Sequence, residues 1–220
     1  MFGADEILWV EGQTEQECFP HLLNFSGVPP RSGLSIVAVR ATGDFETGRV
    51  KAAAIWEIYD RLSRGNALLA PAVAFSFDRE GRSEEDIRDL QRRSGAVVHF
   101  LPRRMYENYL IAPKAIVAVV NRTAERKIAE EDVLQWLQVN GGNPIYEARN
   151  NWRNDPYDLD WLKNVRGAKL LSDLFSSLSA ATVEYRKPFH SIELTEWLLE
   201  KEPDHLAGVV EYVKSLVAVD

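Results

Sequence analysis

Carboxylates stand directly after two apolar runs of the kind that form buried strands. Glu11 follows the run ILWV, and Asp78 follows the run AVAFSF. Glu15 comes four residues after Glu11, and Glu80 comes two residues after Asp78. In an open parallel sheet, ligands bind beyond the carboxyl ends of the strands, so these side chains are expected to meet at one edge. Carboxylate oxygens in that number suit Mg²⁺ or Mn²⁺.

A further carboxylate, Glu107, follows the fourth apolar run of the chain. Like charges gathered this closely need a counter-charge to stay ionised. The sequence therefore predicts a site for divalent cations, with Glu11, Glu15, Asp78, Glu80 and Glu107 as the candidate ligands. Glu11 is also the candidate for taking the proton from the attacking water. Taken singly, each carboxylate is as typical of a helix cap or a solvated loop, so the metal hypothesis rests on the joint pattern.

Basic side chains follow the same strand ends and are the candidates for binding nucleic acid. The net charge is −7, so contacts to phosphate have to come from local cations. The predicted contacts are Arg79, Arg103, Arg104 and Arg166. The alternative for Arg103 and Arg104 is a structural role beside Glu107. Lys169 is the candidate for a catalytic cation that offsets phosphate charge, against the ordinary alternative of a surface lysine, and Lys187 is the second candidate.

The first hundred residues alternate between strand and helix patterns. Strands are expected at 7–10, 34–39, 72–77 and 96–101, and helices at 14–25, 48–64 and 83–93. Thr14 and Ser83 are the expected N-caps, and Pro20 is expected to kink or break the first helix. This alternation predicts an α/β fold with a mostly parallel four-stranded sheet and helices on both faces.

From residue 105 onward only helical periodicity remains. The expected helices are 105–121, 130–139, 158–164, 167–180, 191–201 and 204–217. The segment 140–157 is rich in Gly, Asn and Pro and is expected to be a loop, in which Trp152 is a candidate for stacking on a base. We therefore expect an α/β core at 1–121 and a helical subdomain packed on it at 122–220.

Composition narrows the class of protein. The chain has 220 residues, of which 45% are hydrophobic and 27% charged, as in ordinary globular proteins. No apolar run is long enough for a membrane span, and acidic residues stand where a secretory signal would be basic. A single cysteine excludes a disulfide framework and a cysteine zinc cluster. The expected compartment is the cytoplasm, and no contact with a membrane is expected.

Four segments resemble motifs of a known family. Residues 10–15 (VEGQTE) look like the first motif of Toprim domains, and residues 77–80 (FDRE) look like their aspartate-x-aspartate motif. Residues 101–110 (LPRRMYENYL) are similar to a segment of the OLD (overcoming lysogenization defect) nucleases and related phage-defence proteins. Residues 167–171 (GAKLL) look like their later lysine segment. Glu80 departs from the aspartate-x-aspartate motif, which has a second aspartate at that position. The side chain of glutamate is longer than that of aspartate.

The resemblance covers about residues 6–190 and implies a Toprim fold. It also implies a metal-dependent endonuclease that hydrolyses DNA by a two-metal mechanism. In OLD proteins an ATPase domain usually precedes the nuclease, and no Walker A glycine loop is present here, so an ATPase domain or subunit is an expected partner. A homo-oligomer is a further expectation. Two alternatives stay open: an RNase acting on tRNA or structured RNA, and a Toprim-like scaffold that binds metal or a partner without cleaving.

Overall fold

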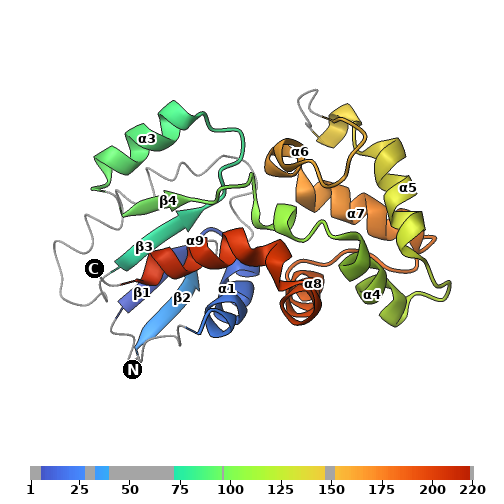
Figure 1. Cartoon of the computed structure of the whole chain (residues 1–220). Coiled ribbons are helices and arrows are strands. Elements are labelled where there is room, and N and C mark those ends of the chain that lie inside the picture. Colours follow the sequence, from blue (N-terminus) through green and yellow to red (C-terminus); the bar gives the residue numbers. More distant parts are fainter. Residues whose placement is uncertain (1–5, 28–32, 40–71, 96, 147–151, 219–220) are drawn as a thin grey trace. The chain divides into compact units, whose positions relative to one another are not determined.

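The computed structural model describes residues 6–27, 33–39, 72–95, 97–146 and 152–218 (Figure 1). The helix expected at 48–64 lies outside these residues. The chain divides into two compact units. The sheet unit contains residues up to 78, residues 82–101 and residues 210–220, and the helical unit contains residues 79–81 and 102–209.

The sheet unit is built on four parallel strands in the order β2-β1-β3-β4. The strands are β1 (Glu6–Val10), β2 (Leu34–Ala38), β3 (Ala72–Phe77) and β4 (Val98–Phe100). The α/β fold with a parallel sheet is therefore confirmed. Because β1 and β3 are neighbours at the centre, the residues that follow them lie side by side, with Val10 opposite Ser76.

Side chains of β3 alternate between the two faces of the sheet. Phe75 and Phe77 pack with Val98, Phe100 and Ile87, the last on α3 (Glu84–Arg93). Ser76 points to the opposite face, where its hydroxyl lies 2.8 Å from that of Tyr212 on α9 (Ala207–Val217). Helix α9 crosses the sheet in Figure 1. The C-terminal helix thus closes one face of the sheet.

Helix α1 (Gln13–Phe25) starts earlier than the sequence predicts. Gly12, not Thr14, is the N-cap residue, and it is Glu15 whose carboxylate accepts a hydrogen bond from the Gly12 amide. The helix continues through Pro20, because the buried apolar side chains on both sides of the proline hold it in place. The expected N-cap Ser83 is confirmed in α3, where its hydroxyl accepts from the Asp86 amide at 3.1 Å.

The helical unit consists of short helices around a core of its own. They are η2 (Tyr106–Tyr109), α4 (Pro113–Thr123), α5 (Glu130–Asn140), η3 (Pro144–Tyr146), α6 (Leu159–Asn164), α7 (Gly167–Leu178), α8 (Phe189–Lys201) and η4 (Pro203–Leu206). Helix α4 packs against α5 and α8. The hydroxyl of Tyr106, which is fully buried, lies 2.9 Å from that of Thr195 on α8.

The two units differ from the domains expected from the sequence at 1–121 and 122–220. The helical unit already begins at residue 102, because α4 buries its apolar face against other helices of that unit. The last residues return to the sheet unit, because α9 packs on β3 through Tyr212. No helix of the described residues is long and apolar enough to cross a membrane.

Candidate active site

The Glu11 carboxylate, which follows β1, lies at the backbone of Asp78, which follows β3. The backbone amide of Asp78 donates a 2.9 Å hydrogen bond to Oε2 of Glu11. Both residues are half-buried, and Oδ1 of Asp78 is shielded from solvent. The Arg82 guanidinium donates to the Asp78 carbonyl oxygen at 2.9 Å, which places a cation at the same strand end. The convergence expected for Glu11 and Asp78 is thus present.

Glu15 joins this strand end from the first turn of α1. It is buried, with 5% of its surface exposed, and its Oε2 accepts from the Gly12 amide at 3.1 Å. A Cβ atom at position 12 would lie 3.1 Å from the same oxygen, so glycine leaves room for the carboxylate. The neighbouring Gln16 accepts a 2.7 Å hydrogen bond from the Ala38 amide, and this bond ties the start of α1 to the end of β2. Sequence reasoning did not single out Gln16.

The donor chemistry of this site fits a hard divalent cation, since Glu11, Glu15 and Asp78 supply carboxylate oxygens only. In the arrangement described, however, no three Asp, Glu, His or Cys side chains of the described residues are gathered closely enough to hold a metal ion. Glu11 and Glu15 each turn one oxygen to a backbone amide instead.

The other two predicted ligands, Glu80 and Glu107, belong to the helical unit. The amide of Glu80 donates to the Arg104 carbonyl oxygen at 2.8 Å, and its backbone adopts a left-handed conformation with φ of 48°. Glu107 is 1% exposed and forms an ion pair with Lys187. Lys187, the second candidate for the catalytic cation, is thereby held beside residues 107–110, the ENYL segment.

Asn108, the next residue, joins the ENYL segment to the turn between α6 and α7. It is fully buried, and its Nδ2 donates to the carbonyl oxygens of Leu162 and Val165, each at 2.8 Å. Its Oδ1 accepts from the Gly167 amide at 3.1 Å. A Cβ atom at position 167 would lie 2.3 Å from that oxygen, so only glycine fits there. Two segments singled out in the sequence are therefore in direct contact.

Arg103 and Arg104, predicted to bind nucleic acid, make contacts within the helical unit. The Arg103 guanidinium lies 4.4 Å from the centre of the Tyr109 ring and donates to the Asn108 carbonyl oxygen at 2.7 Å. Burial lowers the pKa of Arg103, and Tyr109 partly opposes this shift. Arg104 donates to the Asn164 carbonyl oxygen at 3.3 Å. Both arginines thus support the ENYL segment and the end of α6.

Lys169 lies on the exposed side of α7. Its ammonium forms a 2.7 Å ion pair with Asp173, four residues further along the same helix. Asp173 also accepts a 3.0 Å hydrogen bond from the Tyr146 hydroxyl. Arg166, the residue before α7, is exposed, and Arg79 is half-buried.

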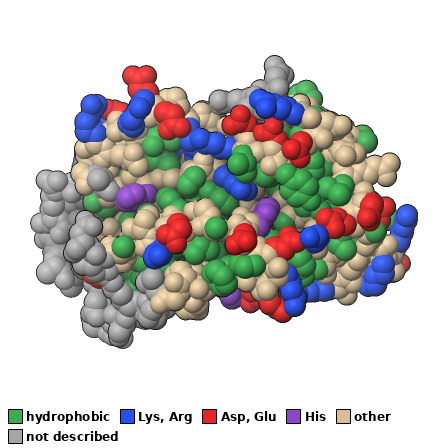
Figure 2. Space-filling view, in the orientation of Figure 1, with side chains coloured by type: hydrophobic (Ala, Val, Ile, Leu, Met, Phe, Trp, Pro, Cys, Tyr) green, Lys and Arg blue, Asp and Glu red, His purple; other side chains and the backbone are tan. Residues whose placement is uncertain are grey.

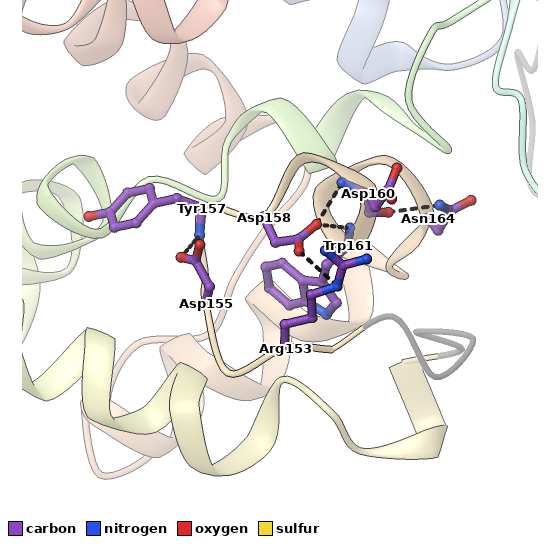
Figure 3. A network of polar contacts seen from close by, with 7 residues as sticks. All are labelled: Arg153, Asp155, Tyr157, Asp158, Asp160, Trp161 and Asn164. Carbon is purple, nitrogen blue, oxygen red and sulfur yellow. Dashed lines mark hydrogen bonds and ion pairs between the residues drawn. The ribbon is translucent and has the colours of Figure 1, made fainter.

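A polar network shapes the turn before α6 (Figure 3). Asp158 caps this helix by accepting from the amides of Asp160 and Trp161, at 2.8 and 3.1 Å. Arg153 forms an ion pair with the other oxygen of Asp158 at 3.7 Å, and the labelled side chains of Figure 3 show both interactions. Trp152 packs against Trp161, with ring centres 4.7 Å apart. Trp152 is therefore part of the packing of this turn.

Comparison with known proteins bears on the fold. No family model and no curated protein matches the chain. Among solved structures, it is similar to the C-terminal region of the Burkholderia pseudomallei OLD protein, with a TM-score of 0.52 and 14% identity over 99% of this chain and 100% of that chain. A second similar structure is the C-terminal region of the Xanthomonas campestris pv. campestris OLD protein, with a TM-score of 0.49, 11% identity, and 96% and 93% of the two chains covered.

At this level of identity the likeness concerns the fold. The resemblance to OLD proteins, noted above from short motifs, is thus matched by a structure that aligns with nearly the whole chain. The chain has the fold of the C-terminal region of an OLD protein.

Proposed function

We propose that the chain is the nuclease region of an OLD-type protein and hydrolyses phosphodiester bonds of DNA with divalent cations. The observation that carries this proposal is the contact between Glu11 and Asp78 at the ends of two adjacent parallel strands. Two acidic residues at this position in a sheet lie where ligands of parallel α/β folds bind. The buried Glu15 beside them adds a third carboxylate.

In this proposal Glu11, Glu15 and Asp78 hold the metal, and Glu80 remains a further predicted ligand. Bound Mg²⁺ or Mn²⁺ would supply Lewis-acid activation of water and stabilisation of the leaving oxygen. Glu11, whose carboxylate accepts a hydrogen bond from the Asp78 amide, is the residue that takes the proton from the water. We propose a different role for Glu107, because its carboxylate forms an ion pair with Lys187.

We assign the cation that offsets phosphate charge to Lys187 rather than Lys169. The Lys187 side chain is 47% exposed, and its ammonium forms an ion pair with the nearly fully buried carboxylate of Glu107, so the ammonium has a fixed place. Lys169 pairs with a partner one helical turn away, an arrangement common on any solvated helix.

The proposed partner is an ATPase domain or subunit. The similar structures are C-terminal regions, so each comes from a longer OLD protein. A net charge of −7 disfavours tight binding of nucleic acid by this chain alone, and a further domain or a second copy would supply additional contacts.

A cleavage assay on two substrates tests the proposal. Supercoiled plasmid and total tRNA are incubated with Mg²⁺, Mn²⁺, Ca²⁺ or excess EDTA, and Asp78→Ala and Glu85→Gln are tested beside the wild type. We expect plasmid cleavage with Mg²⁺ or Mn²⁺, none with EDTA, loss in Asp78→Ala and no change in Glu85→Gln, an exposed carboxylate on α3. Cleavage of tRNA alone would favour the RNase alternative. Full activity in EDTA would contradict the metal site.

A further inference from the structure

Exposed aromatic rings are candidates for contacts with nucleic-acid bases. The charges near each ring decide whether a phosphate backbone could also be bound there. Three aromatic side chains of the described residues are largely exposed: Phe25 at 49%, Tyr157 at 52% and Phe189 at 58%. Tyr157 faces three acidic groups and one cation: burial and then Glu130 raise its pKa, Lys114 lowers it, and Glu202 and Asp155 raise it further. Phe25 ends α1, whose last turn has no basic residue. Neither place attracts a phosphate backbone.

Two cations, Arg186 and Lys187, stand three and two positions before Phe189 in the chain. Lys187 is held by the buried Glu107, and Arg186 is exposed and forms no ion pair within the described part of the chain. Residues two positions apart in a chain have Cα atoms within about 7 Å of each other. The ring and the two cations thus come from one short stretch of chain.

The Phe189 ring has a firm support behind it. The ring packs against His190 in a T-shaped arrangement, with ring centres 5.0 Å apart and planes at 73°. His190 is itself buried, stacks on Tyr185 with centres 5.8 Å apart, and accepts a 2.7 Å hydrogen bond from the Arg186 amide. One side of Phe189 is therefore fixed, while more than half of its surface stays open to solvent.

We propose that Phe189 stacks on an unpaired base of the nucleic acid, while Lys187 and Arg186 contact the neighbouring phosphates. This inference rests on the proposed nuclease function and makes it more specific, because a stacked base has to be free of its partner strand. The helical unit then favours single-stranded or locally opened nucleic acid over intact duplex.

Binding without cleavage tests the inference. The full chain is titrated in EDTA onto a fluorescently labelled single-stranded DNA oligonucleotide and onto the duplex of the same sequence, with anisotropy as the readout. The variants are Phe189→Ala, Phe189→Tyr and Phe25→Ala, the last being an exposed phenylalanine of the sheet unit.

We expect Phe189→Ala to weaken single-strand binding by about tenfold to a hundredfold and duplex binding by less than about twofold. Phe189→Tyr keeps a ring and should retain the affinity, and Phe25→Ala should bind as the wild type does. Equal losses for both substrates, no loss in Phe189→Ala, or no single-strand binding by the wild type would each overturn the inference. Metal-dependent plasmid cleavage by the wild type, measured separately, shows whether the proposed nuclease function survives such a result.

Discussion

At the scale of residues, the acidic side chains predicted to bind metal differ in the groups that contact their carboxylates. Glu11 accepts a hydrogen bond from a backbone amide, whereas Glu107 is paired with a lysine and almost fully buried. An amide leaves the negative charge of a carboxylate in place, while a lysine compensates it. Glu107 is therefore the better candidate for holding Lys187, and Glu11 remains a proposed ligand of the metal.

Substitutions at Glu11 separate its charge from its hydrogen bond. Glu11→Gln keeps an oxygen that can accept from the Asp78 amide, so the free energy of unfolding in urea should change little. Glu11→Ala removes the acceptor and should lower that free energy by about 1 kcal/mol. Both variants should lose metal-dependent plasmid cleavage, because both lack the charge. Cleavage by Glu11→Gln at the wild-type rate would show that the charge is not needed.

The two candidate lysines should also behave differently. Lys187→Ala leaves the buried Glu107 without its partner, and we expect the free energy of unfolding to fall by about 1–2 kcal/mol, since the exposed half of the lysine moderates the loss. The double variant Lys187→Ala/Glu107→Gln should regain most of this stability.

Lys169→Ala is the matched control, because its pair with Asp173 is exposed and contributes about 0.5 kcal/mol at most. Urea unfolding of the wild type, the two lysine variants and the double variant measures these differences. A stability loss in Lys169→Ala as large as that in Lys187→Ala would contradict the assignment.

At the scale of elements, local sequence patterns predicted the strands and a helix cap, because these features depend on residues close together in the chain. Each described strand coincides with an apolar run, and the Ser83 cap follows from a short acidic turn. The spacing of Lys169 and Asp173, four residues apart on a helix, could have identified their pair from the sequence. The pair of Lys187 with Glu107 could not be identified, because it joins segments far apart in the chain.

The contacts of Asn108 were likewise invisible in the sequence. An asparagine in a short polar segment carries no sign that its amide will be buried against the turn between α6 and α7. The same holds for Arg103, which looks like a surface cation until Tyr109 packs under its guanidinium. Such roles depend on tertiary packing, and a single sequence does not encode them in a local pattern.

The turn between α6 and α7 gives a prediction for an element. Gly167→Ala would bring a Cβ atom within 2.3 Å of the Asn108 side chain and 2.9 Å of its backbone nitrogen. Since backbone has to move, we expect the free energy of unfolding to fall by about 1–3 kcal/mol.

The same substitution at Gly208 provides the control. A Cβ atom there meets nothing within 4 Å, and the residue lies in α9, so Gly208→Ala should be neutral or stabilising by up to about 1 kcal/mol. Thermal and urea unfolding compare the two variants. Equal stability of Gly167→Ala and the wild type would show that the turn is not locked by Asn108.

At the scale of the whole molecule, stability should depend on pH through two histidines. Burial lowers the pKa of His190 and of His205, and Arg103 lowers that of His205 further. The unfolded chain therefore binds protons more readily than the folded one. Stability should be complete above the unfolded pKa of about 6.5 and fall as the pH drops below it toward the folded values.

His205→Gln isolates one of these groups. Glutamine can still donate to the Tyr109 backbone, to which His205 is hydrogen-bonded, but it does not titrate. Between pH 7.5 and 5.5 the variant should lose stability less steeply than the wild type, by at most about 1.4 kcal/mol per pH unit. Parallel curves of the free energy of unfolding against pH would exclude His205 as a contributor.

Charge is distributed unevenly over the molecule. On the face drawn in Figure 2, basic and acidic side chains alternate over short distances, although the total is −7. No large positive field is needed if nucleic acid is held by a few cations such as Lys187 and Arg186. The acidic residues at the ends of β1 and β3 form a local centre of negative charge, which has to be balanced by bound cations.

This need for bound cations predicts that Asp78→Asn changes the melting temperature in opposite directions, relative to the wild type, without and with metal. In EDTA, Asp78→Asn removes one of the crowded negative charges beside Glu11, so its melting temperature should equal or exceed that of the wild type. With Mg²⁺ or Mn²⁺ near a hundred times the dissociation constant, the wild type should gain about 2.7 kcal/mol, or about 5 °C and more in melting temperature. Asp78→Asn should gain far less, while Glu85→Gln should follow the wild type.

NaCl of equal ionic strength controls for screening, which acts on all variants alike. Equal metal-induced shifts in Asp78→Asn and the wild type would mean that the cation binds elsewhere, whatever the outcome of the cleavage assay.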